Sequence, residues 1–202
     1  SGTGFYLKLW QDLGVVAPEA LDFSGSAVGF LKRQYPQLKI HQLDIGEQTL
    51  ALPAQSYDVI SAFDVFFHIV DDNKYATALR NVAKLLKPGG YLLFSENFTH
   101  HEHPRGGDYH YSRTLEVISA LVGSVGLKIE YRRPMFVLMN APDDSTGRWT
   151  RLRWRLIRRI ATHSEKAGWL MGIVLYPQEL VLTAVKRESS TTEIAVCKKR
   201  HH

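Results

Sequence analysis

The chain has 202 residues, a length typical of one domain, and its 45% hydrophobic and 11% aromatic content excludes an intrinsically disordered protein. A single cysteine, Cys197, excludes a disulfide framework and a zinc site built from several thiolates, and it fits a reducing, cytoplasmic location. The net charge of +5 is uneven: residues 1–127 carry 10 Lys/Arg and 13 Asp/Glu, whereas residues 128–202 carry 15 and 7.

The chain opens with Ser1-Gly2-Thr3-Gly4, a pattern typical of the second half of a glycine-rich nucleotide-binding turn. Glycine suits such a turn because it permits positive φ and a close approach of a ligand to the backbone. A helix is predicted over 5–13, with Gly14 as its end. No strand precedes this turn, so we expect a strand, an acid and a first glycine upstream of Ser1. The terminal His201-His202 is interpreted as the start of a purification tag.

Three predicted strands each end in an acidic residue. The strands and acids are 20–23 with Asp22, 39–43 with Asp44, and 57–63 with Asp64. A helix at 27–35, capped by the turn Ser24-Gly25-Ser26, separates the first two strands. The nearly continuous apolar run 57–63 predicts a strand that is covered on both faces.

The second half of the pattern continues the alternation of strands and helices. The expected elements are a helix at 73–86, a turn at 87–90, a buried strand at 91–95, a helix from Thr114 to Val125 stopped by Gly126, and a strand at 127–131. This order predicts an α/β fold with a doubly wound, mostly parallel sheet, in which ligands bind at the carboxyl ends of the strands. The most apolar stretch, 169–176, is shorter than the roughly 20 residues that span a bilayer, so no membrane span is predicted.

These segments together resemble the class I S-adenosylmethionine-dependent methyltransferases. Gly2-Thr3-Gly4 looks like the end of that family's first motif, 57–63 is similar to its fourth-strand motif, and 85–91 resembles the Pro-Gly-Gly turn before its fifth strand. Residues 113–127 look like the helix and turn before strand six. The resemblance covers about 1–135 and returns at 192–199, which would form the antiparallel last strand.

The resemblance implies a Rossmann-like fold whose first strand is missing from this chain. It divides the sequence into a methyltransferase core at 1–135 and 191–200 and an acceptor-side lid or helical insertion at 136–190. It also implies S-adenosylmethionine as the cofactor and transfer of its methyl group to a small-molecule acceptor by in-line displacement. No nucleic-acid partner is expected, and the oligomeric state is not predicted.

Cofactor-binding residues follow from the same resemblance. The family's second-strand acid, which binds the ribose hydroxyls, matches Asp22, and the acid beside the adenine matches Asp44. Each also has a plainer interpretation, a helix-capping acid for Asp22 and a turn acid for Asp44. The predicted cofactor-binding residues are Gly2, Thr3, Gly4, Asp22, Phe23, Asp44, Ile45 and Phe63.

The acceptor side offers one candidate base. His68 follows the strand at 57–63, and its imidazole titrates in the range useful for general base catalysis. A histidine that only packs or hydrogen-bonds at the start of the next helix is the alternative. The predicted substrate-binding residues are Phe67, Tyr109, Arg113 and Met139, the last from an apolar segment at 135–139.

The segment 99–103, Thr-His-His-Glu-His, holds imidazoles and a carboxylate, which are suitable ligands for zinc or a similar ion. Adjacent histidines point in different directions on most backbones, and Pro104 and two glycines follow. We therefore interpret this segment as a mobile substrate loop and predict no metal.

The segment 149–160 combines a helical apolar stripe with six arginines between Arg148 and Arg159 and no acid. Trp149, Leu152, Leu156 and Ile160 share one helical face. We interpret it as a lid whose apolar face covers the acceptor site. Contact with an anionic membrane surface or with nucleic acid is the alternative.

Two other functions remain open at this stage. An NAD(P)-dependent oxidoreductase shares the glycine-rich turn and the ribose acid. A non-catalytic methyltransferase-like scaffold would bind a partner through the arginine-rich helix.

Overall fold

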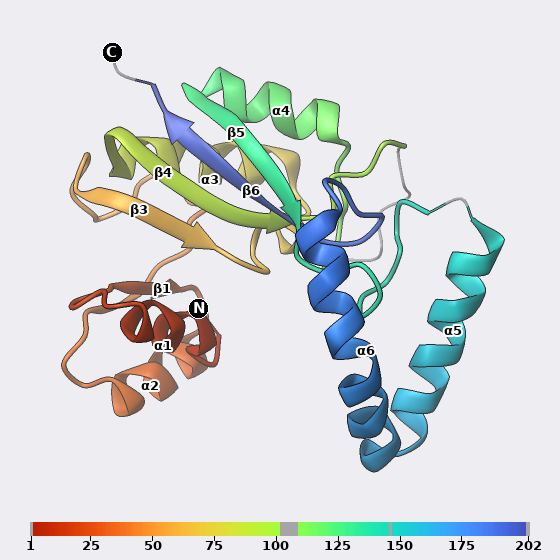
Figure 1. Cartoon of the computed structure of the whole chain (residues 1–202). Coiled ribbons are helices and arrows are strands. Elements are labelled where there is room, and N and C mark those ends of the chain that lie inside the picture. The colour runs from red at the N-terminus through yellow and green to blue at the C-terminus, as the bar shows by residue number, and fades with distance from the viewer. Residues whose placement is uncertain (1, 102–108, 146, 201–202) are drawn as a thin grey trace.

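The computed structural model describes residues 2–101, 109–145 and 147–200 (Figure 1). Its helices are α1 (Phe5–Asp12), α2 (Gly25–Gln34), α3 (Asp72–Leu85), α4 (Leu115–Ser124), α5 (Arg148–His163) and α6 (Glu165–Val185), with a 3-10 turn η1 (Phe66–His68). Its strands are β1 (Ala20–Asp22), β2 (Ile40–Gln42), β3 (Tyr57–Ala62), β4 (Leu86–Glu96), β5 (Leu127–Pro134) and β6 (Glu193–Lys199). The α/β class is confirmed.

The described strands form two sheets and not one. A parallel pair, β1–β2, stands beside a four-stranded sheet of order β3-β4-β6-β5. In the larger sheet β3 and β4 are parallel, and β6 is antiparallel to both β4 and β5. This confirms a mostly parallel sheet with an antiparallel last strand, because β6 alone runs against the other three.

The two sheets are joined by side chains instead of a strand ladder. The indole Nε1 of Trp10, on α1, donates to Ser61 Oγ on β3 at 2.8 Å. The hydroxyl of Tyr57, also on β3, donates to the carboxylate of Glu19 at 2.8 Å. In the larger sheet β3 is an edge strand. The prediction that it is covered on both faces is wrong at Val59, which is 43% exposed.

The expected Pro-Gly-Gly turn is an irregularity inside β4. The pairing with β3 steps from Tyr57↔Leu86 to Val59↔Tyr91, so extra residues of β4 loop out between two paired positions. Gly90 lies where a Cβ would approach the carbonyl oxygen of Asp58 at 2.9 Å. Only glycine allows the two backbones to come this close.

The predicted helix caps are confirmed. The hydroxyl of Ser24 accepts from the N–H of Ala27 at the start of α2, and the hydroxyl of Thr114 accepts from the N–H of Val117 at the start of α4. These bonds satisfy backbone donors that have no partner inside the helix. Gly126 follows α4 with φ +79°, the left-handed conformation that ends a helix.

The main core lies where α3 and α4 cover one face of the larger sheet (Figure 1). Tyr75, Leu79 and Phe94 have 0% exposed surface there. The final strand completes this core, since Lys199 of β6 donates to the carbonyl oxygen of Ala83 in α3 and to that of Leu86 at the start of β4. The predicted return of the chain to the sheet is thereby confirmed.

Helices α5 and α6 form a hairpin that projects away from the sheets (Figure 1). Within the described chain α5 has no buried residue, and α6 has only Glu179. The prediction that the apolar stripe of α5 covers the domain is therefore wrong for this structure: Trp149 is 83% and Leu156 59% exposed. Helix α5 contacts α6 instead.

The apolar stretch in α6 is also longer than expected. By length and composition alone, the 21-residue helix Glu165–Val185 would be able to cross a membrane, and little of it is buried. The sequence pattern ends at Tyr176 because Pro177 and two polar residues follow. The helix nevertheless continues through Pro177 to Val185.

Candidate functional site

The glycine turn and the first strand acid meet in space. The N–H of Gly2 donates to Asp22 Oδ2 at 2.9 Å, and Asp22 Oδ1 accepts from the N–H of Ser24 at 2.9 Å. Gly2 has φ +52° and a Cβ there would meet no atom within 4 Å, so its backbone faces open space. Asp22 thus closes the loop that leads into α2 and stands at the glycine turn, whereas the helix-capping role considered for it belongs to Ser24, the N-cap of α2.

Gly4 has a different role in the same turn. It is the N-cap of α1 with φ +82°, and a Cβ there would lie 2.8 Å from Leu31 Cδ2 and 3.0 Å from Tyr35 Cε2. Glycine therefore lets the start of α1 pack directly on α2. Thr3 between the two glycines is exposed.

The acid after β2 also closes a turn. Asp44 Oδ1 accepts from the N–H of Gly46 at 2.8 Å, and Asp44 Oδ2 pairs with Lys74 Nζ at 3.3 Å. The carbonyl of Ile45 accepts from Asn81 Nδ2 at 2.8 Å, which fixes this loop on α3. The turn interpretation of Asp44 is thus satisfied in the structure, and its role toward adenine stays a prediction.

Two predicted aromatic residues differ in their surroundings. Phe23 is 75% exposed after β1 and contributes an open apolar surface beside Asp22. The ring of Phe63 lies 4.6 Å, centroid to centroid, from the ring of Tyr6 on α1. Phe63 therefore belongs to the wall between β3 and the glycine turn.

The third strand acid, Asp64, is tied more closely to the site than the sequence indicated. It has φ +54°, a strained conformation for a residue with a side chain, directly after β3. Its N–H donates to Ser95 Oγ at 2.7 Å and its Oδ2 accepts from the hydroxyl of Tyr6 at 3.3 Å. Burial, followed by the nearby Asp64 charge, raises the pKa of Tyr6 to about 12. The acid at a strand end was visible in the sequence, but its partners 58 and 31 residues away were not.

Three predicted acceptor-side residues come together at η1. His68 is exposed, and its Nδ1 lies 2.8 Å from the carbonyl oxygen of Tyr109. The rings of Phe67 and His68 are 4.6 Å apart, and His110 lies 5.2 Å from Phe67. Phe67 is 8% exposed and Tyr109 is 74% exposed, so one side of this cluster is packed against the protein and the other faces solvent.

Arg113 is a buried residue with 2% of its surface exposed, and its role toward the substrate stays a prediction. Its guanidinium donates to Asp72 Oδ1 at 2.7 and 3.0 Å and to the carbonyl of Ile69 at 3.0 Å. It also stacks 3.9 Å above the ring of Tyr75. These contacts fix the segment between η1 and α3.

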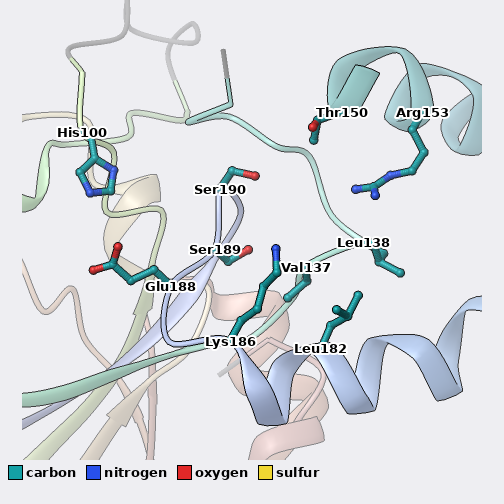
Figure 2. A pocket seen from close by; sticks show the side chains of 10 residues that line it. All are labelled: His100, Val137, Leu138, Thr150, Arg153, Leu182, Lys186, Glu188, Ser189 and Ser190. Atoms are coloured by element: carbon teal, nitrogen blue, oxygen red, sulfur yellow. The ribbon is translucent and has the colours of Figure 1, made fainter. Parts of the chain in front are cut away.

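A pocket of about 450 Å³ lies between the end of the larger sheet and the base of the α5–α6 hairpin (Figure 2). It is lined by His100, Val137, Leu138, Thr150, Arg153, Leu182, Lys186, Glu188, Ser189 and Ser190. Figure 2 shows His100 and Glu188 on one side and Arg153 of α5 on the opposite side. None of the predicted substrate residues lines it, although Met139 directly follows Leu138.

His100 forms a dyad with Asp144 at this pocket. Asp144 Oδ2 lies 2.6 Å from His100 Nδ1, and Asp144 Oδ1 accepts from the His100 N–H at 2.7 Å. The hydrogen bond to Asp144 raises the pKa of the His100 imidazole. A carboxylate on Nδ1 is the arrangement that orients a general base and leaves Nε2 for a substrate. The sequence pattern places His100 in a loop, but Asp144 lies 44 residues away and no local spacing links the two residues.

The apolar segment 135–139 is held by α6. The carboxylate of Glu179 accepts from the N–H groups of Val137, Leu138 and Met139 at 2.8, 2.7 and 3.3 Å. Val137 and Leu138 are 7% and 8% exposed. Met139 is partly buried, and its role toward a substrate stays a prediction.

A buried polar network links the η1 cluster to the dyad. Asn97 Nδ2 donates to Ser112 Oγ at 2.9 Å and to Asp143 Oδ2 at 3.0 Å, and Ser112 Oγ lies 3.2 Å from His110 Nε2. Beside it, Glu96 is fully buried at the end of β4, and burial raises its pKa to about 8. Hydrogen bonds through Asn97 therefore connect the cluster at η1 with the segment that carries Asp144.

The metal interpretation of the histidine-rich segment has no support in the described residues, where no group of three potential ligands occurs. Glu102 and His103 lie outside the described residues. The dyad contact of His100 with Asp144 gives this histidine another role.

The chain is similar to known methyltransferases in sequence. Residues 1–94 match the family model described as a methyltransferase domain. A curated protein of Mycobacterium tuberculosis, named "Probable S-adenosylmethionine-dependent methyltransferase", is 32% identical over 76 residues. That match covers 38% of this chain and 26% of the relative, so the chain spans about a quarter of the curated protein that it resembles.

Solved structures share the fold over almost the whole chain. An S-adenosylmethionine-dependent methyltransferase of Methanosarcina mazei has a TM-score of 0.61 at 11% identity and covers 100% of this chain and 90% of its own. The [4+2]-cyclase SpnF has a TM-score of 0.62 at 16% identity and covers 99% and 72%. At these identities the likeness shows the fold alone. Fold, family-model match and curated relative agree in their similarity to the class I S-adenosylmethionine-dependent methyltransferases.

Proposed function

We propose that this protein binds S-adenosylmethionine and transfers its methyl group to a small-molecule acceptor by in-line displacement. The observation that carries the proposal is the junction of Gly2 with Asp22, because it sets a carboxylate beside a glycine turn with open space in front of it. The match of residues 1–94 to a methyltransferase domain and the 32% identity over 76 residues to a curated probable methyltransferase support it.

The residues of this junction fit the chemistry of the cofactor. A ribose diol needs a carboxylate acceptor, and Asp22 provides one in which each oxygen is oriented by one backbone N–H. The adenine needs an apolar neighbour, which the exposed ring of Phe23 supplies. Once bound, the cofactor would supply an electrophilic methyl group on a sulfonium, and the remaining tasks fall to the chain.

The chain has to hold the acceptor and, for an alcohol or another protonated acceptor, remove a proton. The pocket of about 450 Å³ is large enough for a small molecule and presents the His100–Asp144 dyad. We place the acceptor there and propose His100 as the base. The other candidate, His68, remains the alternative in the neighbouring cluster, where its Nδ1 is occupied by the Tyr109 carbonyl.

The two rival functions are weaker. The family match supports methyl transfer over hydride transfer from NAD(P). SpnF is named as a cyclase, so a shared fold does not decide the chemistry. A cytoplasmic location stays a proposal, which the buried, free thiol of Cys197 supports.

Calorimetry with S-adenosylhomocysteine, S-adenosylmethionine and NAD tests the proposal. We expect the first two to bind and to raise the melting temperature, because a ligand that binds only the folded state stabilises it. Binding of NAD without binding of either adenosyl compound would refute it. Release of S-adenosylhomocysteine on incubation with candidate acceptors then tests the transfer step.

A further inference from the structure

The α5–α6 hairpin carries an apolar surface that nothing in the described chain covers. The side chains that are at least half exposed on it are Trp149, Leu156, Trp169, Leu170, Ile173, Val174, Tyr176, Leu180, Val181 and Val185. Most of them belong to α6. Exposed apolar surface of this extent marks a site of interaction in a soluble domain.

A strongly basic helix accompanies this surface. Six arginines lie between Arg148 and Arg159 without an acid, and α6 has an acid only at Glu165 and at Glu179. Glu179 is buried against the backbone of 137–139 and does not oppose the arginines. The hairpin therefore presents apolar and cationic side chains together, which matches the interface of an anionic bilayer.

The aromatic residues fit the same partner. Trp149 begins α5, and Trp169 and Tyr176 lie in α6, all more than half exposed. Tryptophan and tyrosine favour the headgroup level of a bilayer, where the ring is apolar and its polar tip stays hydrated. Arginine stems can also lie along apolar surface while the guanidinium reaches phosphate.

The hairpin geometry favours lying on the membrane over crossing it. Helix α6 alone is long and apolar enough to span. However, α5 packs alongside α6 (Figure 1), so a span would carry its arginines into the hydrocarbon region. A charged side chain there is strongly unfavourable. In addition, Glu179 ties the second half of α6 to the folded domain through three backbone N–H groups.

We propose that the α5–α6 hairpin docks on the surface of a bilayer rich in anionic phospholipids, with the exposed face of α6 among the acyl chains and the arginines of α5 at the phosphates. This proposal does not depend on the proposed methyl transfer. A second copy of the chain fits less well, because an interface over both helices would bring two arginine-rich helices together. Nucleic acid would satisfy the arginines but leave the apolar face of α6 exposed.

Co-sedimentation of the full chain with vesicles tests the docking. We expect binding to vesicles of phosphatidylcholine with phosphatidylglycerol, weaker binding to phosphatidylcholine alone, and loss of binding at high salt. The triple variant Arg155→Gln, Arg158→Gln, Arg159→Gln should weaken binding about 100-fold, since each surface arginine contributes to attraction by the leaflet. Lys32→Gln with Arg33→Gln, two exposed basic positions in α2, is the control and should bind as the unchanged protein does.

The apolar contribution is tested by Trp169→Ser with Ile173→Ser. This variant should lose vesicle binding, whereas Leu13→Ser with Val16→Ser, which alters two other exposed apolar positions, should retain it. Circular dichroism confirms that each variant is folded. Failure of the unchanged chain to bind anionic vesicles at low salt would overturn the proposal. So would equal binding by the Trp169/Ile173 variant, or a dimer or RNA complex that forms without any vesicle binding.

Discussion

The carboxylate of Asp22 accepts a hydrogen bond from the backbone N–H of Gly2 at 2.9 Å, which joins the glycine turn to the end of β1. Parallel strands place their carboxyl ends at the same edge of a sheet. The Gly2–Asp22 hydrogen bond holds the acid that ends β1 beside the start of α1. The same carboxylate takes the N–H of Ser24. Asp22 is thus oriented by the fold before any ligand is present.

Replacing Asp22 by alanine should weaken S-adenosylhomocysteine binding by about 2 kcal/mol, because a ribose hydroxyl loses a charged acceptor. Calorimetry on the two proteins measures the difference. Asp58→Ala serves as the control, since its carboxylate is 78% exposed and pairs with the side chain of Lys87. An affinity for Asp22→Ala within twofold of the original would remove Asp22 from the proposed site.

The close backbone approach at Gly90 predicts a stability effect. Alanine there would place a Cβ 2.9 Å from the carbonyl oxygen of Asp58 and 3.0 Å from that of Lys87, and neither backbone atom moves easily. We expect Gly90→Ala to lower the free energy of unfolding by about 1–3 kcal/mol. Urea denaturation measures it.

Gly123→Ala is the matched control for this experiment. Gly123 lies inside α4, and a methyl group added there would have no atom within 4 Å, so alanine should be neutral or should stabilise the helix by up to about 1 kcal/mol. Equal stability of the two variants would contradict the close packing at Gly90.

Much of the element order could be predicted from the sequence, because it depends on local signals. The caps at Ser24 and Thr114 and the helical ending at Gly126 act over a few residues, and each lies where it was expected. The exposure of Val59 was not predicted, since the apolar run 57–63 does not show how fully each face of the strand is covered by the rest of the chain.

The candidate site was predicted less completely, for the same reason. Asp22 lies at the glycine turn as the pattern indicated. Arg113 was predicted to bind the substrate because it lies in a loop among aromatic residues. Its observed partner, Asp72, lies 41 residues away and could not be identified from the local pattern. The His100–Asp144 contact is equally remote in sequence. Side-chain partners separated by such distances depend on the tertiary fold, which motif spacing does not describe.

The buried Glu96 predicts how stability depends on pH. Burial raises its pKa to about 8 in the folded chain, above the ordinary value of 4.5. Between these two values the unfolded chain releases a proton that the folded chain retains. The free energy of unfolding should therefore decrease as the pH rises through this window and level off above it.

Glu96→Gln removes this titration. The variant should gain stability relative to the unchanged chain as the pH rises from about 5 to about 8, by a few kcal/mol at most. Denaturation in urea at several pH values checks this, with the exposed Glu116→Gln as the control. A difference in stability that stays constant over that range would contradict a protonated Glu96.

The last prediction concerns the dyad at the pocket. The hydrogen bond that the His100 imidazole donates to Asp144 raises the pKa of His100, so the neutral imidazole that a base requires forms at a higher pH than for an isolated histidine. Asp144→Asn should lower that pKa, which an NMR titration of the histidine resonances measures without any acceptor. In turnover, the same variant should move the acidic limb of the rate to lower pH.

The two histidine candidates can then be separated. His100→Gln should lower kcat by about 10²–10⁴-fold if the acceptor must lose a proton, and it should leave S-adenosylhomocysteine affinity unchanged because His100 lies at the pocket and outside the Gly2–Asp22 junction. His68→Gln is the matched substitution in the η1 cluster and should have a smaller effect. A large loss of kcat in His68→Gln, with full activity in His100→Gln, would assign the base to His68 and place the acceptor beside Phe67 and Tyr109.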